Sequence, residues 1–573
     1  MPTIAEHLVA SLAEHGVTHV WGVVGDALNP VTDAIRREDR VEWMGVRHEE
    51  VAAFAAGAQS QLTGRLGVCM GTVGPGAIHL LNGLYDAKKS HTPVLAICGQ
   101  VPRADIGSDY FQEVDNDVLF SDVAVFSATI TSEEQLPGII EQAANAALTE
   151  RGVAVLTLPG DVGGLDLDKA LTHSTFARPP APAGPDDEAL TAAAAAINAA
   201  ERVTLLVGRG ARPARDAVLA LADRLAAPMV ITLQAKEGFD GTDHEVGLSG
   251  LLGGPASKVA FDGCDLLVML GTDFPYTEFI PQGVPVVQVD HAGRHIGRRA
   301  TVTHPVVGDV ARTVDALLPL VEVKADRSHL EAARERHATW QERQQQFVDP
   351  DYDRKPRGLL RRKVDNPDAR VRPELLAAMV DRHAAADAVF TADTGMSTVW
   401  LARFVRMTGG RQLLGSFNLG SMANAMPQAL GVAALDRQRQ TIAFCGDGGL
   451  TMLLGDLITA VSHDLPVKLV VFDNGRLGMV KLEMEQVGLP EYGTVLHNPD
   501  LAAVARSMGL HGVRVEDPHD VEDAVRAVLA HDGPALLDVV TSADEIALPP
   551  KPTHEQGWGF AIAKAKEFVD SPE

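Results

Sequence analysis

The sequence predicts an α/β protein made of three doubly wound domains, each built on a parallel sheet. Short apolar runs alternate with helical patterns along most of the chain, for example HVWGVVG, VLAICG, VTLLVGRG, DLLVMLG, TIAFCGDG and VKLVVFDN. These runs are apolar throughout, which is typical of strands buried on both faces in a parallel sheet covered by helices. A length of 573 residues suits about three or four domains of roughly 150 residues each.

Two stretches without strand patterns divide the chain. The proline-rich segment FARPPAPAGPDD, within residues 162–188, predicts a linker. Residues 322–372 are highly charged and favour a helical connection over the surface. The predicted parts are domains at 1–180, 185–325 and 370–545, a charged linker at 326–369 and a C-terminal tail at 546–573. The first and third domains each carry a glycine-dense turn after an apolar run, MGTVGPGA and CGDGGL, which is a weak internal similarity.

The first residues predict an amphipathic helix, with Ile4, Leu8, Leu12 and Val17 near one face. This segment lacks a basic region and a cleavage site, so we do not expect a signal peptide. No run of eighteen apolar residues occurs, so we expect no membrane-spanning helix.

The composition indicates a soluble protein of the cytoplasm. The net charge is −26, from 50 basic and 76 acidic side chains, which argues against nucleic acid or an anionic membrane as the main partner. We expect at most weak, peripheral contact with the inner face of the plasma membrane. The four cysteines are far apart, without metal-ligand spacing, and are expected to be buried in a reducing compartment: Cys69, Cys98, Cys264 and Cys445.

The stretch FCGDGGL places Asp447 at the end of an apolar run, between glycines. A carboxylate at the carboxyl end of a parallel strand lies where open α/β sheets bind ligands, and the glycines let a phosphate approach the backbone. Mg²⁺ joins a carboxylate and phosphates, because it prefers oxygen ligands. The next strand, VKLVVF, ends in Asp473-Asn474-Gly475, so Asp447 and Asn474 are predicted to face each other across neighbouring strand ends.

GDGG followed by DNGRLGMV resembles the thiamine diphosphate (ThDP) and magnesium motif of ThDP-dependent enzymes. The resemblance implies that Asp447, Asn474 and the backbone carbonyl of Arg476 bind Mg²⁺. Asp473 stands where family members usually have a further asparagine. The remaining positions implied to contact ThDP here are Gly448, Gly449, Gly475, Leu477, Gly478 and Met479.

Two further segments resemble the same family. RHEEVAAFAAGA is similar to the motif of the pyrimidine-binding domain, in which the glutamate after the histidine is catalytic, and this implies Glu49 rather than Glu50. That glutamate hydrogen-bonds the aminopyrimidine ring of a ThDP held by the other subunit, and so starts acid–base catalysis through the cofactor. SFNLGSMANAMPQALG matches positions that contact the pyrimidine at Gly420, Ser421 and Met422, while Leu419 departs from the histidine of close relatives.

The middle domain resembles the FAD domain of pyruvate oxidases and of quinone-dependent pyruvate dehydrogenases. The motif Gly208-x-Gly210 is weak evidence by itself. The positions that match FAD contacts are Ser249, Gly250, Leu251, Leu252, Thr272, Asp273, Phe274, Pro275, Tyr276 and Asp290. SDYFQEV matches the active-site loop of the same group, with Phe111 and Gln112 near the reacting carbons, and Glu483 matches a carboxylate that faces the substrate.

The resemblance covers residues 1–560 and is nearest to the bacterial pyruvate:quinone oxidoreductases. It implies oxidative decarboxylation of pyruvate to acetate and CO₂, with electrons passed through FAD to a quinone, in a homotetramer whose active sites lie between subunits. Three alternatives stay open: a phosphate- and oxygen-dependent pyruvate oxidase, a carboligase of the acetolactate-synthase type, and a non-catalytic flavoprotein subunit. The relatives usually extend further and bind lipid there, whereas here a stripe from Trp558 to Val569 is expected to dock on its own domain.

Overall fold

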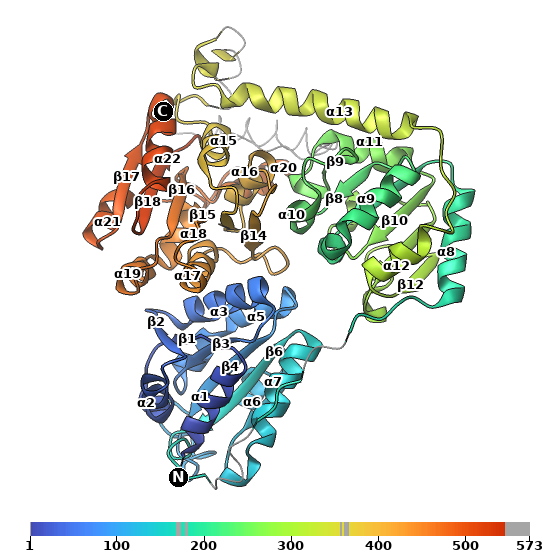
Figure 1. Cartoon of the computed structure of the whole chain (residues 1–573). Coiled ribbons are helices and arrows are strands. Elements are labelled where there is room, and N and C mark those ends of the chain that lie inside the picture. Colours follow the sequence, from blue (N-terminus) through green and yellow to red (C-terminus); the bar gives the residue numbers. More distant parts are fainter. Residues whose placement is uncertain are drawn as a thin grey trace.

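The computed structural model describes residues 2–167, 174–177, 181–355, 358–359, 362 and 366–544. It contains three six-stranded sheets in which every strand pairing is parallel. Each sheet uses one continuous stretch of chain, and we call each sheet with its helices a unit (Figure 1). The predicted α/β fold class is therefore confirmed. The predicted tail at 546–573 lies outside the described residues.

The first unit has strand order β2-β1-β3-β4-β6-β5. One apolar cluster under α1, α2 and α7 covers one face of the sheet and includes Ile4, Leu8, Leu12 and Val17. The first three lie on α1, as the amphipathic pattern predicts, whereas the helix ends at Glu14 and Val17 lies beyond it. A second cluster, under α3 and α5, covers the other face and continues into the third unit. The strands are β1 (His19–Gly22), β2 (Glu42–Gly45), β3 (Gly67–Gly71), β4 (Val94–Gln100), β5 (Ala124–Thr129) and β6 (Val153–Pro159). The helices are α1 (Ile4–Glu14), α2 (Asn29–Arg37), α3 (Glu49–Thr63), α4 (Pro75–His79), α5 (Leu81–Lys89), α6 (Asn116–Leu119) and α7 (Gly138–Glu150).

The second unit has order β12-β11-β10-β7-β8-β9, in which the first strand, β7, lies beside the fourth, β10. This is the strand order of dinucleotide-binding folds, whose ligands bind where the order reverses. The strands are β7 (Val203–Val207), β8 (Met229–Ile231), β9 (Glu245–Leu248), β10 (Leu266–Leu270), β11 (Val286–Asp290) and β12 (His304–Val307). The helices are α8 (Asp187–Ala199), α9 (Arg215–Arg224), α10 (Lys236–Phe239), α11 (Pro255–Gly263) and α12 (Val310–Leu317).

The third unit has order β14-β13-β15-β16-β18-β17, which repeats the topology of the first unit. The shared topology accounts for the similarity between the two glycine-dense turns, because both follow the third strand of their sheet. The strands are β13 (Val389–Ala392), β14 (Gln412–Gly415), β15 (Thr441–Gly446), β16 (Lys468–Asp473), β17 (His511–Val515) and β18 (Ala535–Val540). The helices are α15 (Pro373–His383), α16 (Met396–Phe404), α17 (Ala425–Leu435), α18 (Asp447–Met452), α19 (Leu457–Ser462), α20 (Gly478–Gln486), α21 (Leu501–Ser507) and α22 (Val521–Leu529).

The units contact one another through helices and loops. Helix α13 (Ser328–Gln345) crosses from the second unit to the third in the charged region (Figure 1). Helix α3 of the first unit packs on α17 of the third, where Gln59 Nε2 donates to the carbonyl of Gly431 at 3.0 Å. The second and third units meet where the backbone N–H of Leu413 donates to Glu237 at 2.8 Å. All four cysteines are free and buried, as expected. Among the described residues, no helix is both long enough and apolar enough to cross a membrane.

Candidate functional site

A cavity opens at the carboxyl ends of the third sheet, where the strand order reverses between β13 and β15. This is the edge and the position at which open α/β sheets bind ligands. The two strands end in buried carboxylates, Asp393 after β13 and Asp447 after β15. The lining residues are Asp393, Thr394, Gly395, Met396, Ser397, Trp400, Met422, Gly446, Asp447, Gly448, Gly449, Phe472, Asn474, Arg476, Leu477, Gly478, Met479, Val480, Thr541 and Ser542.

The turn from β15 into α18 has no room for side chains at two of its glycines. A Cβ atom on Gly448 would lie 2.8 Å from Leu477 Cδ2. A Cβ atom on Gly449 would lie 2.4 Å from Asp393 Oδ2, closer than real contacts allow. Glycine at these positions therefore keeps the turn packed on its neighbours while its backbone lines the cavity.

Asp447 and Asn474 meet at the cavity, as the sequence predicts. Asp447 Oδ2 accepts hydrogen bonds from the backbone N–H of Gly475 at 3.0 Å and from Asn498 Nδ2 at 2.6 Å. Asn474 Oδ1 accepts from the backbone N–H of Arg476 at 2.9 Å. Burial raises the pKa of Asp447 to about 7, although the hydrogen bond from Asn498 opposes the rise. A buried carboxylate beside an amide oxygen is a donor set that suits a hard divalent cation, which would favour the ionised form.

The other predicted contacts of the third unit divide into two groups. Met422, Leu477, Gly478 and Met479 line the same cavity as Asp447. Gly420, Ser421 and Gly475 do not line it. The Ser421 hydroxyl instead accepts a hydrogen bond from Asn82 of the first unit at 2.8 Å.

Glu49 begins α3 of the first unit and is buried, with Oε2 3.0 Å from His79 Nδ1. The rings of His48 and His79 stack with their centroids 4.5 Å apart, which orders this end of the helix. The residues that line the cavity all belong to the third unit, so one chain alone does not bring Glu49 into the lining with Asp447.

The predicted positions of the second unit gather at the carboxyl edge of its sheet. Ser249–Leu252 follow β9, Thr272–Tyr276 follow β10, and Asp290 ends β11. Gly208 and Gly210 pack against the backbone of the turn at Gly271, where a Cβ atom on Gly208 would lie 2.3 Å from the Gly271 carbonyl oxygen. The two glycines therefore allow the loops after β7 and β10 to touch at the reversal point.

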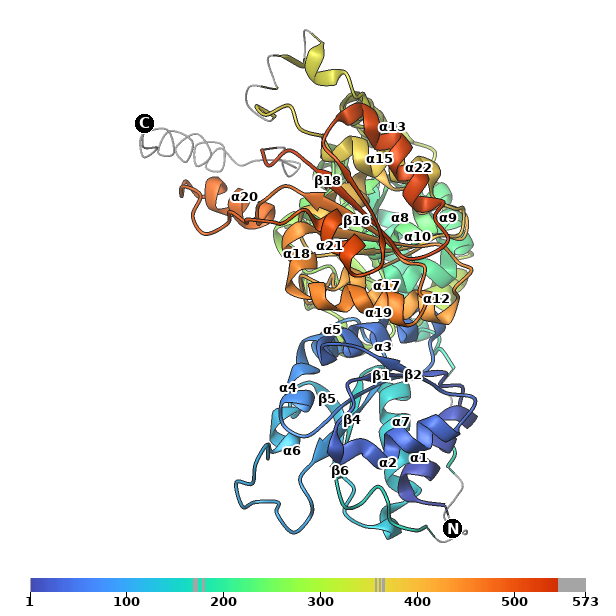
Figure 2. The same cartoon turned by 90° about the vertical axis from the view of Figure 1, so that its left-hand side faces the viewer.

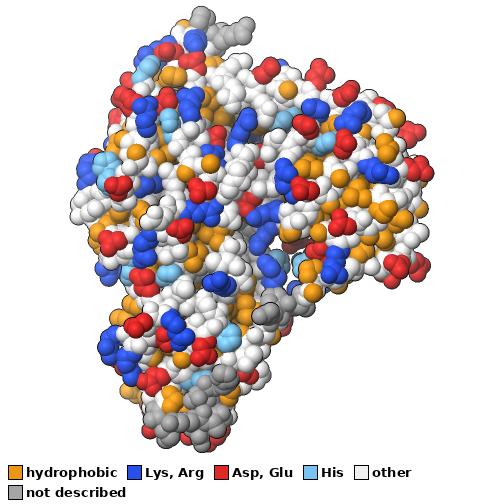
Figure 3. Space-filling view, viewed as in Figure 1, with side chains coloured by type: hydrophobic (Ala, Val, Ile, Leu, Met, Phe, Trp, Pro, Cys, Tyr) orange, Lys and Arg blue, Asp and Glu red, His pale blue; other side chains and the backbone are white. Residues whose placement is uncertain are grey.

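Two polar side chains at the carboxyl edge of the second sheet are notable. One lacks a hydrogen-bond partner, and the other has two histidines close to a single oxygen. The buried Ser249 hydroxyl has no hydrogen-bond partner among the described residues. Asp290 Oδ1 lies 3.1 Å from His295 Nδ1 and 3.2 Å from His291 Nδ1. Burial acts to raise the pKa of Asp290, but hydrogen bonds from His291 and Ala292 leave it below its usual value. Figure 3 shows Lys and Arg side chains around a hollow between the second unit and the other two.

The three predicted substrate contacts are exposed. The Phe111 side chain is 79% exposed, and Gln112 follows it with φ of 66°, in the left-handed region. Glu483 lies on α20, and its charge helps to raise the pKa of Tyr276 of the second unit, after the larger effect of burial. Glu483 is thus close to the predicted positions of the second unit.

Sequence reasoning missed Asp393, Asn498 and His79. The run AVFTAD ends in an aspartate as TIAFCGD does, so the signal for Asp393 was present at a second strand end. Asp393 accepts hydrogen bonds from the backbone N–H groups of Ala425 at 2.9 Å and Gly446 at 3.3 Å. Burial raises its pKa to about 7. Asn498 and His79 lie far along the chain from the residues they contact, and no local pattern marks them.

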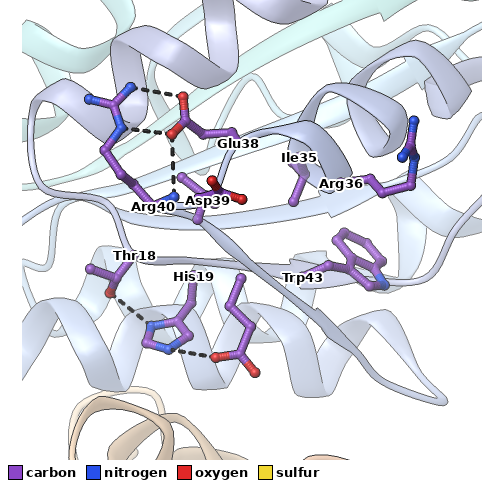
Figure 4. A pocket seen from close by; sticks show the side chains of 10 residues that line it. Thr18, His19, Ile35, Arg36, Glu38, Asp39, Arg40 and Trp43 are labelled. Atoms are coloured by element: carbon purple, nitrogen blue, oxygen red, sulfur yellow. Dashed lines mark hydrogen bonds and ion pairs between the residues drawn. The ribbon is translucent and has the colours of Figure 1, made fainter.

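A further pocket, shown in Figure 4, lies in the first unit at the amino ends of the sheet strands, opposite to the carboxyl ends where ligands bind in such sheets. Thr18 and His19 lie at the start of β1, and Glu42 and Trp43 at the start of β2, so this pocket is at the amino ends of the strands. Two pairs of its polar side chains contact each other, with Arg40 Nε 2.7 Å from Glu38 Oε1 and His19 Nε2 3.8 Å from Glu42 Oε2. Neither its place in the sheet nor its chemistry matches a ligand site of this fold.

Comparison with protein families gives matches in all three units. Residues 2–119 match the model "Thiamine pyrophosphate enzyme, N-terminal TPP binding domain". Residues 190–317 match the central domain of the same enzymes, and residues 393–539 match their C-terminal TPP binding domain. Thiamine pyrophosphate is another name for ThDP.

Curated proteins match over nearly the full length. A Bacillus subtilis protein named "Putative thiamine pyrophosphate-containing protein YdaP" is 37% identical over 99% of this chain and 96% of its own. A pyruvate oxidase of Lactiplantibacillus plantarum is 29% identical over 94% of this chain and 88% of its own. The acetolactate synthase large subunit of Parasynechococcus marenigrum is 32% identical over 96% of this chain and 89% of its own.

Proposed function

Because the chain belongs to the thiamine pyrophosphate enzymes, we propose that it oxidises pyruvate and water to acetate and CO₂ and passes two electrons through FAD to a quinone. The observation that carries the proposal is the pair Asp447 and Asn474 at the carboxyl ends of the neighbouring strands β15 and β16, beside a turn that has no room for side chains. The pyruvate oxidase among the relatives supports the choice of substrate and of an oxidative reaction.

The residues of the cavity fit ThDP and Mg²⁺. Asp447 and Asn474 offer a carboxylate and an amide oxygen, and Arg476 offers its backbone carbonyl. The backbone of Gly448 and Gly449 would hold the diphosphate, and Met422 would support the bend between the two rings of the cofactor. When bound, ThDP supplies a carbon nucleophile that attacks a keto group and stabilises the charge left by loss of CO₂.

Glu49 is proposed as the residue that hydrogen-bonds the pyrimidine ring. It is buried at the start of α3, with Oε2 3.0 Å from His79 Nδ1. Since the cavity of one chain is lined by the third unit alone, we propose that the active site forms between the third unit of one subunit and the first unit of another, in a homotetramer.

Exposed apolar side chains support an interface on this side of the molecule. They belong to α20 with the segment that follows it and to α4, α6 and the loop between β4 and α6, which lie on one side in Figure 2. Such side chains mark contact surfaces when they gather in one area. The third unit contributes Val480, Val487, Leu489, Tyr492 and Val495, and the first contributes Ile78, Ile106, Tyr110, Phe111 and Val118.

FAD is proposed to bind the second unit at its carboxyl edge. The strand order of this unit is that of dinucleotide-binding folds, and the unpartnered Ser249 hydroxyl offers a hydrogen bond there. Segments 249–252 and 272–276 and the Asp290 carboxylate would hold the cofactor, which accepts two electrons when bound. Glu483, Phe111 and Gln112 would face pyruvate between the two cofactors.

A carboligase of the acetolactate-synthase type is the second candidate. It is favoured by the 32% identity to an acetolactate synthase large subunit over 89% of that chain. In that reaction FAD would not accept electrons from the substrate. A phosphate- and oxygen-dependent pyruvate oxidase would differ from the preferred proposal only in the acceptors of the acetyl group and of the electrons.

Rapid mixing of the protein with pyruvate in the absence of oxygen tests the proposal. We expect the purified chain to carry a flavin spectrum, and we expect pyruvate to bleach it within the time of one turnover. Reoxidation by a soluble quinone analogue, with acetate as the product, would support the quinone-dependent reaction. A flavin that stays oxidised while acetolactate accumulates would reject it and favour the carboligase.

A further inference from the structure

We propose that Asn498 is a positioning residue that fixes Asp447 for a divalent cation, and that a buried ion network of Asp473, Arg514 and Asp538 holds Asn498 in place. The inference rests on the proposed cofactor site and adds to it a group of residues outside the cation's own ligands. Asn498 lies on the segment before α21, 51 residues beyond Asp447 in the chain.

Asn498 links the ends of two neighbouring strands through a single nitrogen atom. Its Nδ2 donates to Asp447 Oδ2 at 2.6 Å and to Asp473 Oδ1 at 2.8 Å. An amide nitrogen has two hydrogens, so these two bonds use both of them. The backbone N–H of Gly475 also donates to Asp447 Oδ2, at 3.0 Å. Because Oδ2 thus accepts two hydrogen bonds, the other oxygen, Oδ1, would be the one that holds the cation.

The second carboxylate of the pair, Asp473, is held from its other side. Its Oδ2 lies 3.4 Å from Arg514 Nη1, and the same nitrogen donates to Asp538 Oδ2 at 2.5 Å. Asp538 is fully buried, and it also accepts from the backbone N–H of Leu501 at 3.2 Å, which joins α21 to the network. Arg514, on β17, therefore bridges the end of β16 and the middle of β18, and Asp473 in turn orients the Asn498 amide.

Charge balance also points to a cation. Asp447, Asp473 and Asp538 are three buried carboxylates with one guanidinium, Arg514, among them. Arg514 has a further partner in Glu516, whose side chain is 69% exposed and is screened by solvent. Buried carboxylates in excess of their partners are unfavourable, and a divalent cation at Asp447 would restore the balance. Asp473 stands where the related motif usually has an asparagine, so this network is suited to the extra charge of this chain.

The affinity of the protein for Mn²⁺ in the presence of ThDP tests the inference. It is measured from the loss of the electron paramagnetic resonance signal of free Mn²⁺ on binding. Asn498→Ala should weaken Mn²⁺ binding by about tenfold or more, the usual effect of removing a group that orients a metal ligand. The matched control is Asn198→Ala, which removes an amide that likewise has two partners, Leu320 and Glu322, on the surface of the second unit. This control should bind Mn²⁺ as the wild type does.

The outcomes separate this inference from the proposed function. A wild-type chain that binds no Mn²⁺ with ThDP would reject the cofactor site itself. Wild-type binding with an unchanged affinity in Asn498→Ala would leave the cofactor site standing and overturn the role of Asn498.

The role of the network of Asp473, Arg514 and Asp538 has an independent test. This test also applies if Asn498→Ala does not fold. Arg514→Met removes the guanidinium that holds Asp473, so Asp473 no longer orients the Asn498 amide and Mn²⁺ binding should weaken. Loss of a positive charge by itself would favour a cation, so weaker binding would report the lost orientation. Adding Asp473→Asn gives a neutral residue that needs no guanidinium partner and keeps an oxygen that accepts from Asn498. We therefore expect the double variant to bind Mn²⁺ more tightly than Arg514→Met alone. A double variant that binds Mn²⁺ no more tightly than Arg514→Met would contradict the network.

Discussion

Position decides what the acidic residues of the site do. Asp447 and Asp473 end neighbouring strands, yet Asp447 lines the cavity while Asp473 pairs with Arg514. Glu49 and Glu50 are adjacent, yet Glu49 is buried against His79 while Glu50 accepts a hydrogen bond from Asn82. Neighbouring residues of one type thus differ in burial and partners, and these differences support the roles proposed for Asp447 and Glu49.

Glu49→Gln should leave ThDP bound and slow turnover by roughly a hundredfold or more, the usual scale for loss of an acid–base group. The substitution keeps the size of the side chain and removes its ability to hold a proton for the cofactor. Circular dichroism of bound ThDP and steady-state turnover of pyruvate are the two measurements. Glu50→Gln is the matched control and should keep most of the activity. Equal losses in the two variants would contradict the role of Glu49.

The Asp447–Asn474 pair could be predicted because parallel strands end at one edge, so two strand-end motifs in consecutive strands must meet. Asp393 could have been found by the same argument, since it too follows an apolar run. Asn498 could not, because its two hydrogen bonds join residues 25 and 51 positions away through a loop that has no periodic pattern. The separation of Glu49 from the cavity also depends on how the units pack.

At the scale of elements, the alternation of apolar runs and helical patterns predicted parallel sheets but not their strand orders. The order is set by which helices cover which face, and this depends on packing between distant segments. Helices α3 and α17 show this, since both are rich in small residues and their backbones approach closely. A Cβ atom on Gly431 of α17 would lie 2.3 Å from the carbonyl oxygen of Ala55.

Gly431→Ala should therefore destabilise the packing of the first unit on the third. An added methyl group with no room forces the helices apart, and overpacking of this kind costs typically about 1–3 kcal/mol. Gly455→Ala is the matched control, because a Cβ atom there meets nothing within 4 Å. The midpoint of thermal unfolding should fall by several degrees in the first variant and change little in the second. Equal midpoints would show that the α3–α17 contact can relax without loss.

At the scale of the whole molecule, the contact between the first and third units contains a buried titrating group. Asp86 of α5 accepts a hydrogen bond from Gln428 Nε2 of α17 at 3.2 Å. Burial raises the pKa of Asp86 to about 7, against the effect of hydrogen bonds from Ser416 and Gln428. The folded chain thus binds a proton that the unfolded chain releases at lower pH, near the ordinary value of about 4.

Stability should consequently fall through this group as pH rises from about 4 to about 7, because the folded state binds more protons than the unfolded state in that window. Asp86→Asn keeps the shape and the acceptor for Gln428 but cannot ionise. The quantity to compare is the unfolding midpoint of Asp86→Asn minus that of the wild type. We expect this difference to be more positive at pH 8 than at pH 5. The unfolding midpoints of both proteins at the two pH values provide the measurement. Parallel pH curves would mean that Asp86 does not control this dependence.

If the active site is shared between subunits, as proposed, two inactive variants should regain activity when they are combined in one oligomer. Glu49→Gln and Asp447→Ala should each be nearly inactive, the first because it lacks the acid–base group and the second because it lacks the cation ligand. In a hybrid of the two, one site receives both defects while the other combines the intact Glu49 of one subunit with the intact Asp447 of the other. Random pairing at equal amounts should therefore restore about a quarter of the wild-type sites, if sites form between pairs of subunits in a symmetric oligomer.

Co-expression with different affinity tags allows the hybrid to be isolated. Its pyruvate turnover should be about half that of the wild type per pair of subunits, by the same symmetry. If Glu49 instead served the cavity of its own chain, every site in the hybrid would carry one defect, and the mixture would stay as inactive as its parents.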